Sequence, residues 1–349
     1  MKALRWHGVK DLRIEQIEEP KALPGKVKIK VEWCGICGSD LHEYTAGPIF
    51  IPGSEPHPLT GEQAPVVMGH EFSGQVVEIG EGVTNIQKGD RVVVEPIFNC
   101  GKCTACRQGK YNLCEKMGFL GLAGGGGGFS EYVAADEHRV HKIPQGVSYE
   151  QGALVEPSAV ALYAVRQSKL KVGDKAVVFG AGPIGLLVIE ALKASGASEI
   201  YAVELSPERK EKAAELGALV IDPKEVDAVQ EIHRLTSGGA DVVYEVTGVP
   251  PVLEQALESV KIGGELMIVS IFEKEAPIMP NKIVIQERSI SGIIGYRDVF
   301  PAVISLMEKG FFPADQLVTK RIKLDDVIEH GFEGLLKEKN QVKILVKAE

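Results

Sequence analysis

The sequence predicts an α/β protein in which a β-rich domain accompanies a doubly wound parallel sheet. The first observation is the segment KVKIKVEW at residues 26–33, where apolar and charged side chains alternate with the period of two typical of a half-buried strand. Similar short runs, separated by Gly, Pro and Asn, continue to about residue 150. The second observation is a change of rhythm after residue 175. Short β-branched runs there alternate with helical stretches, as in parallel βαβ units with right-handed crossovers.

The same rhythm predicts where the domains begin and end. We expect the parallel-sheet domain over residues 156–296, because the βαβ alternation stops after Tyr296. Residues 1–155 and 297–349 then form the β-rich domain, to which the closing run QVKILVKA returns as a strand. A chain of 349 residues is long enough for two hydrophobic cores.

Composition and charge argue against several classes of function. The formal net charge of −9 offers no basic surface to a phosphate backbone, so we expect no nucleic-acid partner. No segment reaches the roughly 18 apolar residues of a membrane span, and residues 1–20 lack the apolar core of a secretory signal. We therefore expect a cytoplasmic protein that acts on a small molecule and uses clustered cysteines as metal ligands.

The segment VVFGAGPIGLLVIEAL predicts a dinucleotide-binding turn. Gly180, Gly182 and Gly185 have G-x-G-x-x-G spacing directly after an expected strand, and Pro183 and Ile184 lie between them at the start of an expected helix. The first glycine permits the tight turn, the second permits close approach of a pyrophosphate, and the third permits close packing of helix on strand. The N-terminus of the helix attracts the phosphates through its dipole and its free N–H groups.

Glu204 predicts that the cofactor is NAD. It ends the second expected strand of this unit, about 20 residues after the last glycine, where a carboxylate accepts hydrogen bonds from the ribose hydroxyls. A 2′-phosphate would meet a like charge at this position. Arg209 follows five residues later and could cover the adenine, which leaves some tolerance of NADP open. The alternative is that the glycines serve only the turn and that Glu204 is a solvated strand end.

Four of the six cysteines lie close together in the segment NCGKCTACRQGKYNLC, and we expect them to form a lobe over about residues 99–115. The spacing C-x2-C-x2-C-x7-C can close a tetrahedral shell around zinc, which leaves no position for a substrate and makes the site structural. An iron–sulfur cluster is the main alternative, but the x3-C-P continuation of ferredoxin motifs is missing. Disulfides are a further alternative. The four residues are Cys100, Cys103, Cys106 and Cys114.

A second group of candidate ligands is dispersed along the chain. CGICGSDLH contains Cys37, GHEFSG contributes His70 and Glu71, and ALVEPSA contributes Glu156. A thiolate, an imidazole and a carboxylate are the donors of an open catalytic zinc site with one position left for substrate. Cys34 precedes Cys37 in C-x-x-C spacing, but it ends an expected strand, so we expect a buried structural residue rather than a redox pair.

These motifs together resemble the zinc-dependent medium-chain dehydrogenase/reductase family. CGICGSDLH, GHEFSG, the four-cysteine lobe, GALVEPSAV and GAGPIG occur in the order of that family, and the resemblance covers essentially the whole chain. It implies a GroES-like catalytic domain joined to an NAD-binding Rossmann domain. It also implies a homodimer or homotetramer, between which the sequence does not choose.

The resemblance assigns roles to residues. Cys37 and His70 would bind the catalytic zinc, together with either Glu71 or Glu156, since members of the family differ at the third ligand. Ser39 resembles the family's hydroxyl beside the reacting oxygen, and His42 resembles the outer member of its proton relay. Asp40 is expected to orient this loop or the ligands of the zinc.

The resemblance also implies an activity. VEPIFNCGKCTACRQGKYNLCEKMGFLGLAGGGGGFSEYV and GIIGYRDVFPAV are similar to the branch that interconverts (R,R)-2,3-butanediol and related vicinal diols with acetoin and related ketols. GPIFIP would form an apolar wall for such a substrate. Oxidation of sorbitol, another polyol or L-threonine remains open, as does a zinc-free enzyme resembling quinone reductases. From another class, a catalytically silent protein that binds zinc and NAD also remains open.

Overall fold

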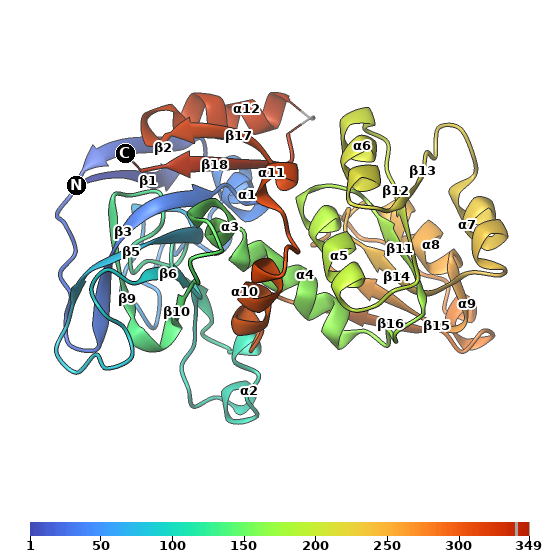
Figure 1. The fold of residues 1–349 in the computed structure, drawn as a ribbon, viewed down its shortest axis with the longest axis horizontal. Helices are drawn as coiled ribbons and strands as arrows, with labels where there is room; N and C mark the ends of the chain where they lie inside the picture. Colours follow the sequence, from blue (N-terminus) through green and yellow to red (C-terminus); the bar gives the residue numbers. More distant parts are fainter. Residues whose placement is uncertain (339–340, 349) are drawn as a thin grey trace. The chain divides into compact units, whose positions relative to one another are not determined.

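The computed structural model describes residues 1–338 and 341–348, which form two compact units (Figure 1). The first contains Met1–Glu156, Phe300–Lys309 and the chain from Val318 onward. The second contains Pro157–Val299 and Gly310–Leu317. The expected boundaries differ from these at Glu156, at 297–299 and at 310–317. The last segment belongs to the second unit because the N–H of Phe312 donates to the buried carboxylate of Glu190 at 3.0 Å.

The first unit is built on a seven-stranded sheet with the order β10-β6-β5-β3-β18-β17, and β9 pairs with residues 26–30 of β3. The closing strand β18 pairs with β3 and so lies in the β-rich unit, to which the sequence assigns it. β3 alternates buried and half-buried residues along KVKIKV, which follows the period of two in its sequence. The strands are β3 (Lys26–Gly35), β5 (Glu71–Ile79), β6 (Arg91–Val94), β9 (Tyr132–Asp136), β10 (Val140–Lys142), β17 (Val318–Lys323) and β18 (Lys343–Lys347).

Two smaller sheets and several short helices complete this unit. The three-stranded sheet has the order β2-β1-β4, and β7 pairs with β8. These strands are β1 (Lys2–Gly8), β2 (Asp11–Gln16), β4 (Val66–Val67), β7 (Ile97–Phe98) and β8 (Gly118–Phe119). The helices are α1 (Gly38–Ala46), α2 (Thr104–Arg107), α3 (Tyr149–Ala153), α10 (Phe300–Glu308) and α12 (Glu333–Lys337), and α4 (Val155–Gln167) begins here and continues into the second unit.

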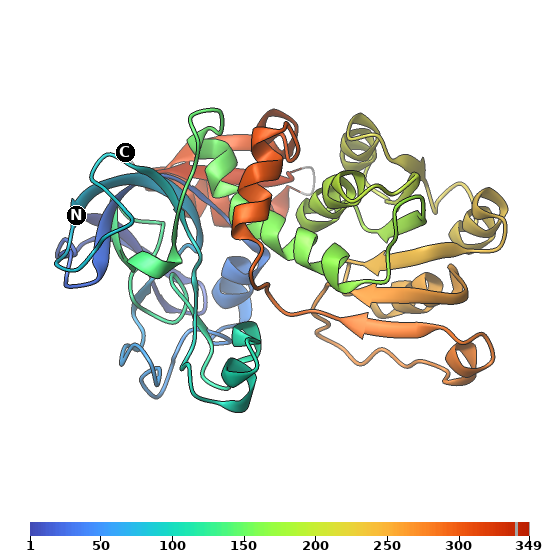
Figure 2. The same cartoon turned by 60° about the horizontal axis from the view of Figure 1, so that its bottom comes forward.

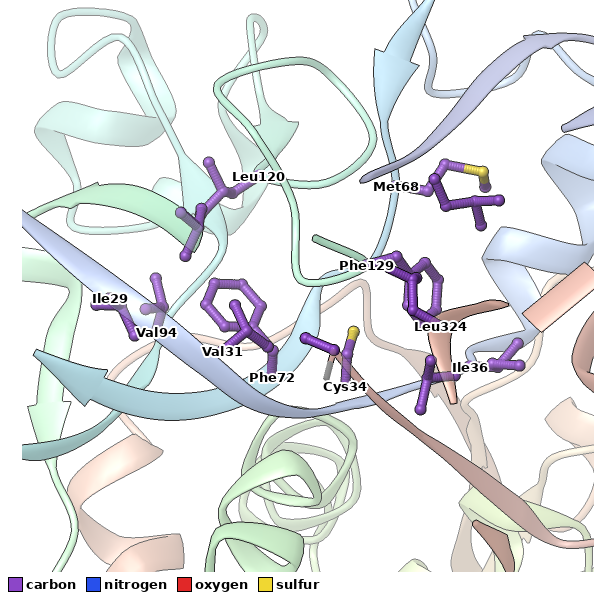
Figure 3. Packing of buried hydrophobic residues seen from close by; sticks show 14 of the residues in the cluster. Ile29, Val31, Cys34, Ile36, Met68, Phe72, Val94, Leu120, Phe129 and Leu324 are labelled. Carbon is purple, nitrogen blue, oxygen red and sulfur yellow. The ribbon is translucent and has the colours of Figure 1, made fainter. Parts of the chain in front are cut away.

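The core of the first unit lies against β3 and β5 (Figure 3). Ile29 and Val31 of β3 and Phe72 of β5 are buried in one apolar cluster with Phe129. Cys34 is fully buried in the same cluster. It is therefore a structural core residue, as expected from its place at the end of a strand.

The second unit is a doubly wound sheet in which every strand pairing is parallel (Figures 1 and 2). The order β13-β12-β11-β14-β15-β16 reverses direction at β11, which is the topology of a dinucleotide-binding sheet. The strands are β11 (Lys175–Phe179), β12 (Glu199–Val203), β13 (Leu219–Ile221), β14 (Ala240–Glu245), β15 (Val260–Ile268) and β16 (Ser289–Gly292). The helices are α5 (Pro183–Ala194), α6 (Pro207–Glu215), α7 (Ala228–Thr236), α8 (Pro250–Glu258), α9 (Asn281–Val284) and α11 (Ala314–Leu317).

The turn between β11 and α5 requires glycine at two positions for different reasons. Gly180 has a φ of 97°, a left-handed conformation that other residues rarely adopt. A side chain at Gly185 would overlap the carbonyl oxygen of Gly180. Gly182 has no such restriction, because the atom closest to an added Cβ is Nη1 of Arg209 at 3.7 Å and its φ is −70°.

Helix composition gives one further result. Among the described residues, no helix has both the length and the apolar character that crossing a membrane requires.

Gly185, which has no room for a side chain, and Gly182, which has room, provide a matched test of this turn. We expect Gly185→Ala to lower the free energy of unfolding by about 1–3 kcal/mol, because the added carbon forces the helix away from the strand. Gly182→Ala should change it by less than about 0.5 kcal/mol. Urea unfolding of both variants without cofactor measures the difference. Equal losses of stability would contradict the assigned packing of α5 on β11.

Candidate active site

Cys37 lies where the chain leaves β3 and enters α1. It is the N-cap of the helix, with an extended backbone at φ −96° and ψ 157°. Asp40, three residues later, accepts a hydrogen bond from the N–H of Cys37 at 3.0 Å, which forms one half of a capping box. The helix cap therefore fixes the backbone that carries the thiol.

His70 and Glu71 approach Cys37 from a distant segment. Gly69 precedes them with a φ of 95°, and a side chain there would crowd Phe129 and Cys34. Both His70 and Glu71 are buried. One ligand atom each of Cys37, His70 and Glu71 lie within 4.8 Å of one another, which is close enough for all three to share a metal ion.

The two nitrogens of His70 face different partners. Nε2 lies 3.3 Å from Oγ of Ser39, and Nδ1 lies 3.4 Å from Oδ1 of Asp40. Burial lowers the pKa of His70, but the carboxylate of Asp40 and the thiol of Cys37 outweigh it and raise the pKa well above its usual value. Asp40 thus faces Nδ1 of the imidazole and leaves Nε2 toward Ser39.

Glu71 is paired with a residue that sequence reasoning missed. Nζ of Lys343 lies 2.7 and 2.9 Å from the two carboxylate oxygens of Glu71, and both side chains are buried. Burial lowers the pKa of Lys343, but Glu71 outweighs it and the pKa rises. The lysine is separated from Glu71 by 272 residues, so no local sequence signal could have revealed the pair.

Glu156 lies in the first turn of α4 and is also buried. Its charge contributes to the raised pKa of Lys343, which places it near the ion pair. The group of ligand atoms within 4.8 Å, as found among the described residues, contains Glu71 and not Glu156. His42 lies on α1 like Ser39, and its side chain is exposed.

The four lobe cysteines form a second group, and their ligand sulfurs also lie within 4.8 Å of one another. Short helical turns space them: α2 starts after Cys103, and the 3₁₀ helix η1 (Tyr111–Leu113) ends before Cys114. All four are free of disulfides. The group therefore has the donor set and spacing of a closed tetrahedral zinc site.

Hydrogen bonds and burial have opposite effects on the lobe thiols. The N–H groups of Cys103 and Lys116 point to the sulfurs of Cys100 and Cys114 at 3.4 and 3.3 Å. Backbone N–H groups, with Lys102 contributing most, lower the pKa of Cys100 to about 6, whereas burial raises that of Cys114 to about 12. Nδ2 of Asn99, which sequence reasoning did not single out, lies 3.4 Å from Sγ of Cys106.

The glycine-rich turn holds the candidate cofactor residues in the second unit. Gly182 is the N-cap of α5 and Pro183 its first residue, followed by Ile184, so the N-terminus of the helix follows the turn. One carboxylate oxygen of Glu204 accepts a hydrogen bond from the N–H of Ala181 at 2.8 Å. Arg209, at the start of α6, lies beside Gly182. The structure therefore places Glu204 and Arg209 at the same turn as the glycines.

Replacing Lys343 by Met should destabilise the first unit strongly, because it leaves the Glu71 carboxylate buried without its cation. We expect a loss of about 3–5 kcal/mol in the free energy of unfolding. Lys2→Met is the control: the side chains of Lys2 and Asp325 are 31% and 61% exposed, so solvent screens their ion pair and its loss should change stability far less. Urea unfolding measures both. Similar losses of unfolding free energy in the two variants would show that the buried ion pair stabilises the protein no more than the exposed one.

Comparisons with known proteins agree with this arrangement. Residues 23–145 match the model of the alcohol dehydrogenase GroES-like domain, and residues 183–309 match that of the zinc-binding dehydrogenases. The chain is 70% identical to (R,R)-butanediol dehydrogenase of Bacillus subtilis, with 99% of both sequences covered, and 45% identical to (R,R)-butanediol dehydrogenase of Neisseria gonorrhoeae, again with 99% of both covered. Sorbitol dehydrogenase of B. subtilis is 37% identical, with 99% of this chain and 97% of that protein covered.

Solved structures lead to the same family. The crystal structure of 2R,3R-butanediol dehydrogenase from B. subtilis superposes with a TM-score of 0.95 at 70% identity and covers 99% of both chains. A zinc-binding dehydrogenase from Sinorhizobium meliloti bound to NADP has a TM-score of 0.90 at 31% identity, covering 99% of this chain and 98% of that one. The expected combination of a GroES-like and a Rossmann domain is confirmed. The chain therefore belongs to the zinc-dependent medium-chain dehydrogenase/reductase family.

Proposed function

We propose that the protein is a zinc-dependent, NAD-linked alcohol dehydrogenase that interconverts (R,R)-2,3-butanediol and related vicinal diols with acetoin and related ketols. The observation that carries this proposal is the group of Cys37, His70 and Glu71, whose ligand atoms lie within 4.8 Å of one another. The names of the relatives at 70% and 45% identity support the choice of substrate.

The donor set of this group fits a catalytic zinc ion. Cys37 offers a thiolate, His70 offers an imidazole nitrogen, and Glu71 offers a carboxylate oxygen. When bound there, zinc supplies a Lewis acid that lowers the pKa of an alcohol and so makes hydride transfer to NAD possible near neutral pH. Glu71 and Glu156 are both candidates for the third ligand, because Lys343 already binds the two oxygens of Glu71.

The chain's own residues orient this site and remove the proton. Asp40 holds the imidazole of His70 at Nδ1, while its other oxygen holds the backbone of Cys37. The hydroxyl of Ser39 lies 3.3 Å from Nε2 of His70. It would accept the proton of a reacting alcohol while passing its own proton on. His42, exposed on the same helix, would pass the proton to water.

The other two sites would serve structure and cofactor binding. Zinc held by Cys100, Cys103, Cys106 and Cys114 would leave no open position, so its role would be to stabilise the lobe. Gly182 at the helix N-terminus would approach the pyrophosphate of NAD, and Glu204 would accept from the ribose hydroxyls, with Arg209 beside the adenine. These thiolate ligands require a reducing compartment, so we propose a cytoplasmic location.

We further propose a homodimer or homotetramer. β16 is an edge strand of the six-stranded sheet. Val284 and Ile285, shortly before it, are 71% and 78% exposed. An edge strand beside exposed apolar side chains favours pairing with a second copy.

Cys37→Ser tests the metal-centred reaction. We expect the variant to lose turnover and one zinc ion per chain while NAD binding persists, because the thiol lies in a different unit from the glycine-rich turn. Metal analysis, NADH titration and steady-state kinetics on one sample measure the three effects. Cys34→Ser is the control and should keep the metal. Full activity of Cys37→Ser would exclude the proposed site.

A substrate panel tests the choice of alcohol. We expect NAD-dependent oxidation of (R,R)-2,3-butanediol and NADH-dependent reduction of acetoin to have the highest kcat/KM, ahead of the meso and S,S isomers, sorbitol and L-threonine. Preference for sorbitol or threonine would assign the protein to another branch of the family. NAD and zinc binding without turnover of any member of the panel would instead indicate a catalytically silent binding protein.

A further inference from the structure

Glu43 is a buried carboxylate for which the proposed reaction has no use. It lies on α1, the helix that starts at Cys37 and carries Ser39. Its side chain is 0% exposed. An ionised group in such a place is stable only when hydrogen bonds replace the water it has lost. The partners of Glu43 therefore indicate what the residue does.

Those partners are three successive backbone N–H groups of one loop. The N–H of Ile49 donates to Oε2 at 2.9 Å, and those of Phe50 and Ile51 donate to Oε1, the latter at 3.1 Å. Hydrogen bonds from neutral N–H groups to a charged oxygen are stronger than those between neutral groups. One carboxylate thus fixes the backbone of the residues 49–51 that follow α1.

Gly47, at the start of the loop, packs directly against Glu43. The N–H of Gly47 donates to the carbonyl oxygen of Glu43 at 3.1 Å, and Nε1 of Trp6 donates to it at 2.9 Å. A side chain at Gly47 would lie 2.6 Å from Oε2 of Glu43 and 3.0 Å from the ring of Trp6. The loop therefore closes directly onto the glutamate, although Ile49 at its tip is 53% exposed.

The loop carries an aromatic side chain toward the metal site. The ring of Phe50 packs edge-on against Phe119, with centroids 5.9 Å apart. Phe119 in turn packs against the imidazole of His70 at 6.2 Å. Two ring contacts therefore connect the loop held by Glu43 to a candidate zinc ligand, all within the first unit.

We propose that Glu43 is a positioning residue for substrate size. By fixing residues 49–51, its carboxylate holds Phe50 against Phe119 and so keeps an apolar wall beside His70. Such a wall accepts the methyl ends of a four-carbon diol and disfavours the extra hydroxyl groups of a longer polyol, which would lose their hydrogen bonds with water. This inference rests on the proposed function and names the device that selects its substrate class.

The test compares Glu43→Gln and Phe50→Ala with the wild type. Gln keeps the shape of the side chain but removes the charge and one acceptor oxygen. We expect each variant to lower the ratio of kcat/KM for (R,R)-2,3-butanediol to that for sorbitol by at least about tenfold. The change should lie in KM, because Ser39 and the metal ligands are untouched, and the zinc content should remain that of the wild type.

Glu265→Gln is the matched control for loss of a buried carboxylate. Glu265 is buried in the second unit and accepts hydrogen bonds from the N–H of Lys169 at 2.6 Å and from Ser291 at 2.5 Å. Its replacement should lower stability without changing the substrate ratio. A fall of the ratio in this control as large as in Glu43→Gln would overturn the proposal, since general destabilisation would then explain both.

A fluorescence measurement reports on the loop without turnover. The chain has two tryptophans, so Trp33→Phe leaves Trp6 as the sole tryptophan, and its fluorescence can be excited selectively. Trp6 is buried against Gly47 and Glu43. Glu43→Gln in this background should increase quenching of Trp6 by acrylamide, whereas Phe50→Ala should change it less.

The outcomes separate this inference from the function on which it rests. If the wild type oxidises (R,R)-2,3-butanediol and Glu43→Gln changes both the ratio and the quenching, the inference is supported. An unchanged ratio in Glu43→Gln, with or without increased quenching, overturns it while the proposed function stands. If the wild type prefers sorbitol, the proposed function fails, and the inference fails with it.

Discussion

The arrangement of the candidate active site in the first unit depends on the buried ion pair of Lys343 and Glu71. Three strands meet there: β3 pairs with β5 at Gly35 and Glu71, and β18 pairs with β3 at Leu345 and Gly35. Gly35 has no side chain, and any Cβ there would overlap a carboxylate oxygen of Glu71. The glycine thus makes room for the carboxylate, and the lysine makes its burial tolerable. The closing strand of the chain therefore fixes Glu71, a candidate metal ligand.

The acidic groups near Cys37 outnumber the ammonium group of Lys343, which favours binding of a divalent cation. Asp40, Glu71 and Glu156 are all buried around Cys37, while Lys343 supplies one ammonium group. Burying several acidic groups with too few cations is costly, since desolvation is not repaid by attraction. A zinc ion would supply the missing positive charge and would also fix the thiol and the imidazole. Of these acidic groups, Asp40 acts with the thiol of Cys37 to raise the pKa of His70 against the opposing effect of burial.

α1 connects three separate tasks because its side chains point to different partners. Its N-cap is Cys37, its first turn carries Ser39 beside His70, and its second turn carries Glu43 beneath the loop of residues 49–51. Since a helix is rigid over two turns, a displacement of one of these residues moves the others. The proposed metal ligand, the proposed proton-accepting hydroxyl and the proposed substrate wall are therefore positioned by one element. This arrangement makes α1 sensitive to substitution even at residues that contact no substrate.

The sequence by itself determined the parallel sheet, the glycine-rich turn and the four-cysteine lobe, because each depends on residues close together in the chain. Periodicity predicts β11 to β16, and the lobe sulfurs converge within residues 100–114. The resemblance supplied the GroES-like domain and the roles of Cys37 and His70. Only the tertiary structure decided that Lys343 pairs with Glu71, that Glu43 holds a loop, and that residues 310–317 join the second unit. These three features depend on burial and on contacts between segments that are far apart in the sequence. The sequence does not indicate which partner will compensate the charge of a buried lysine or glutamate.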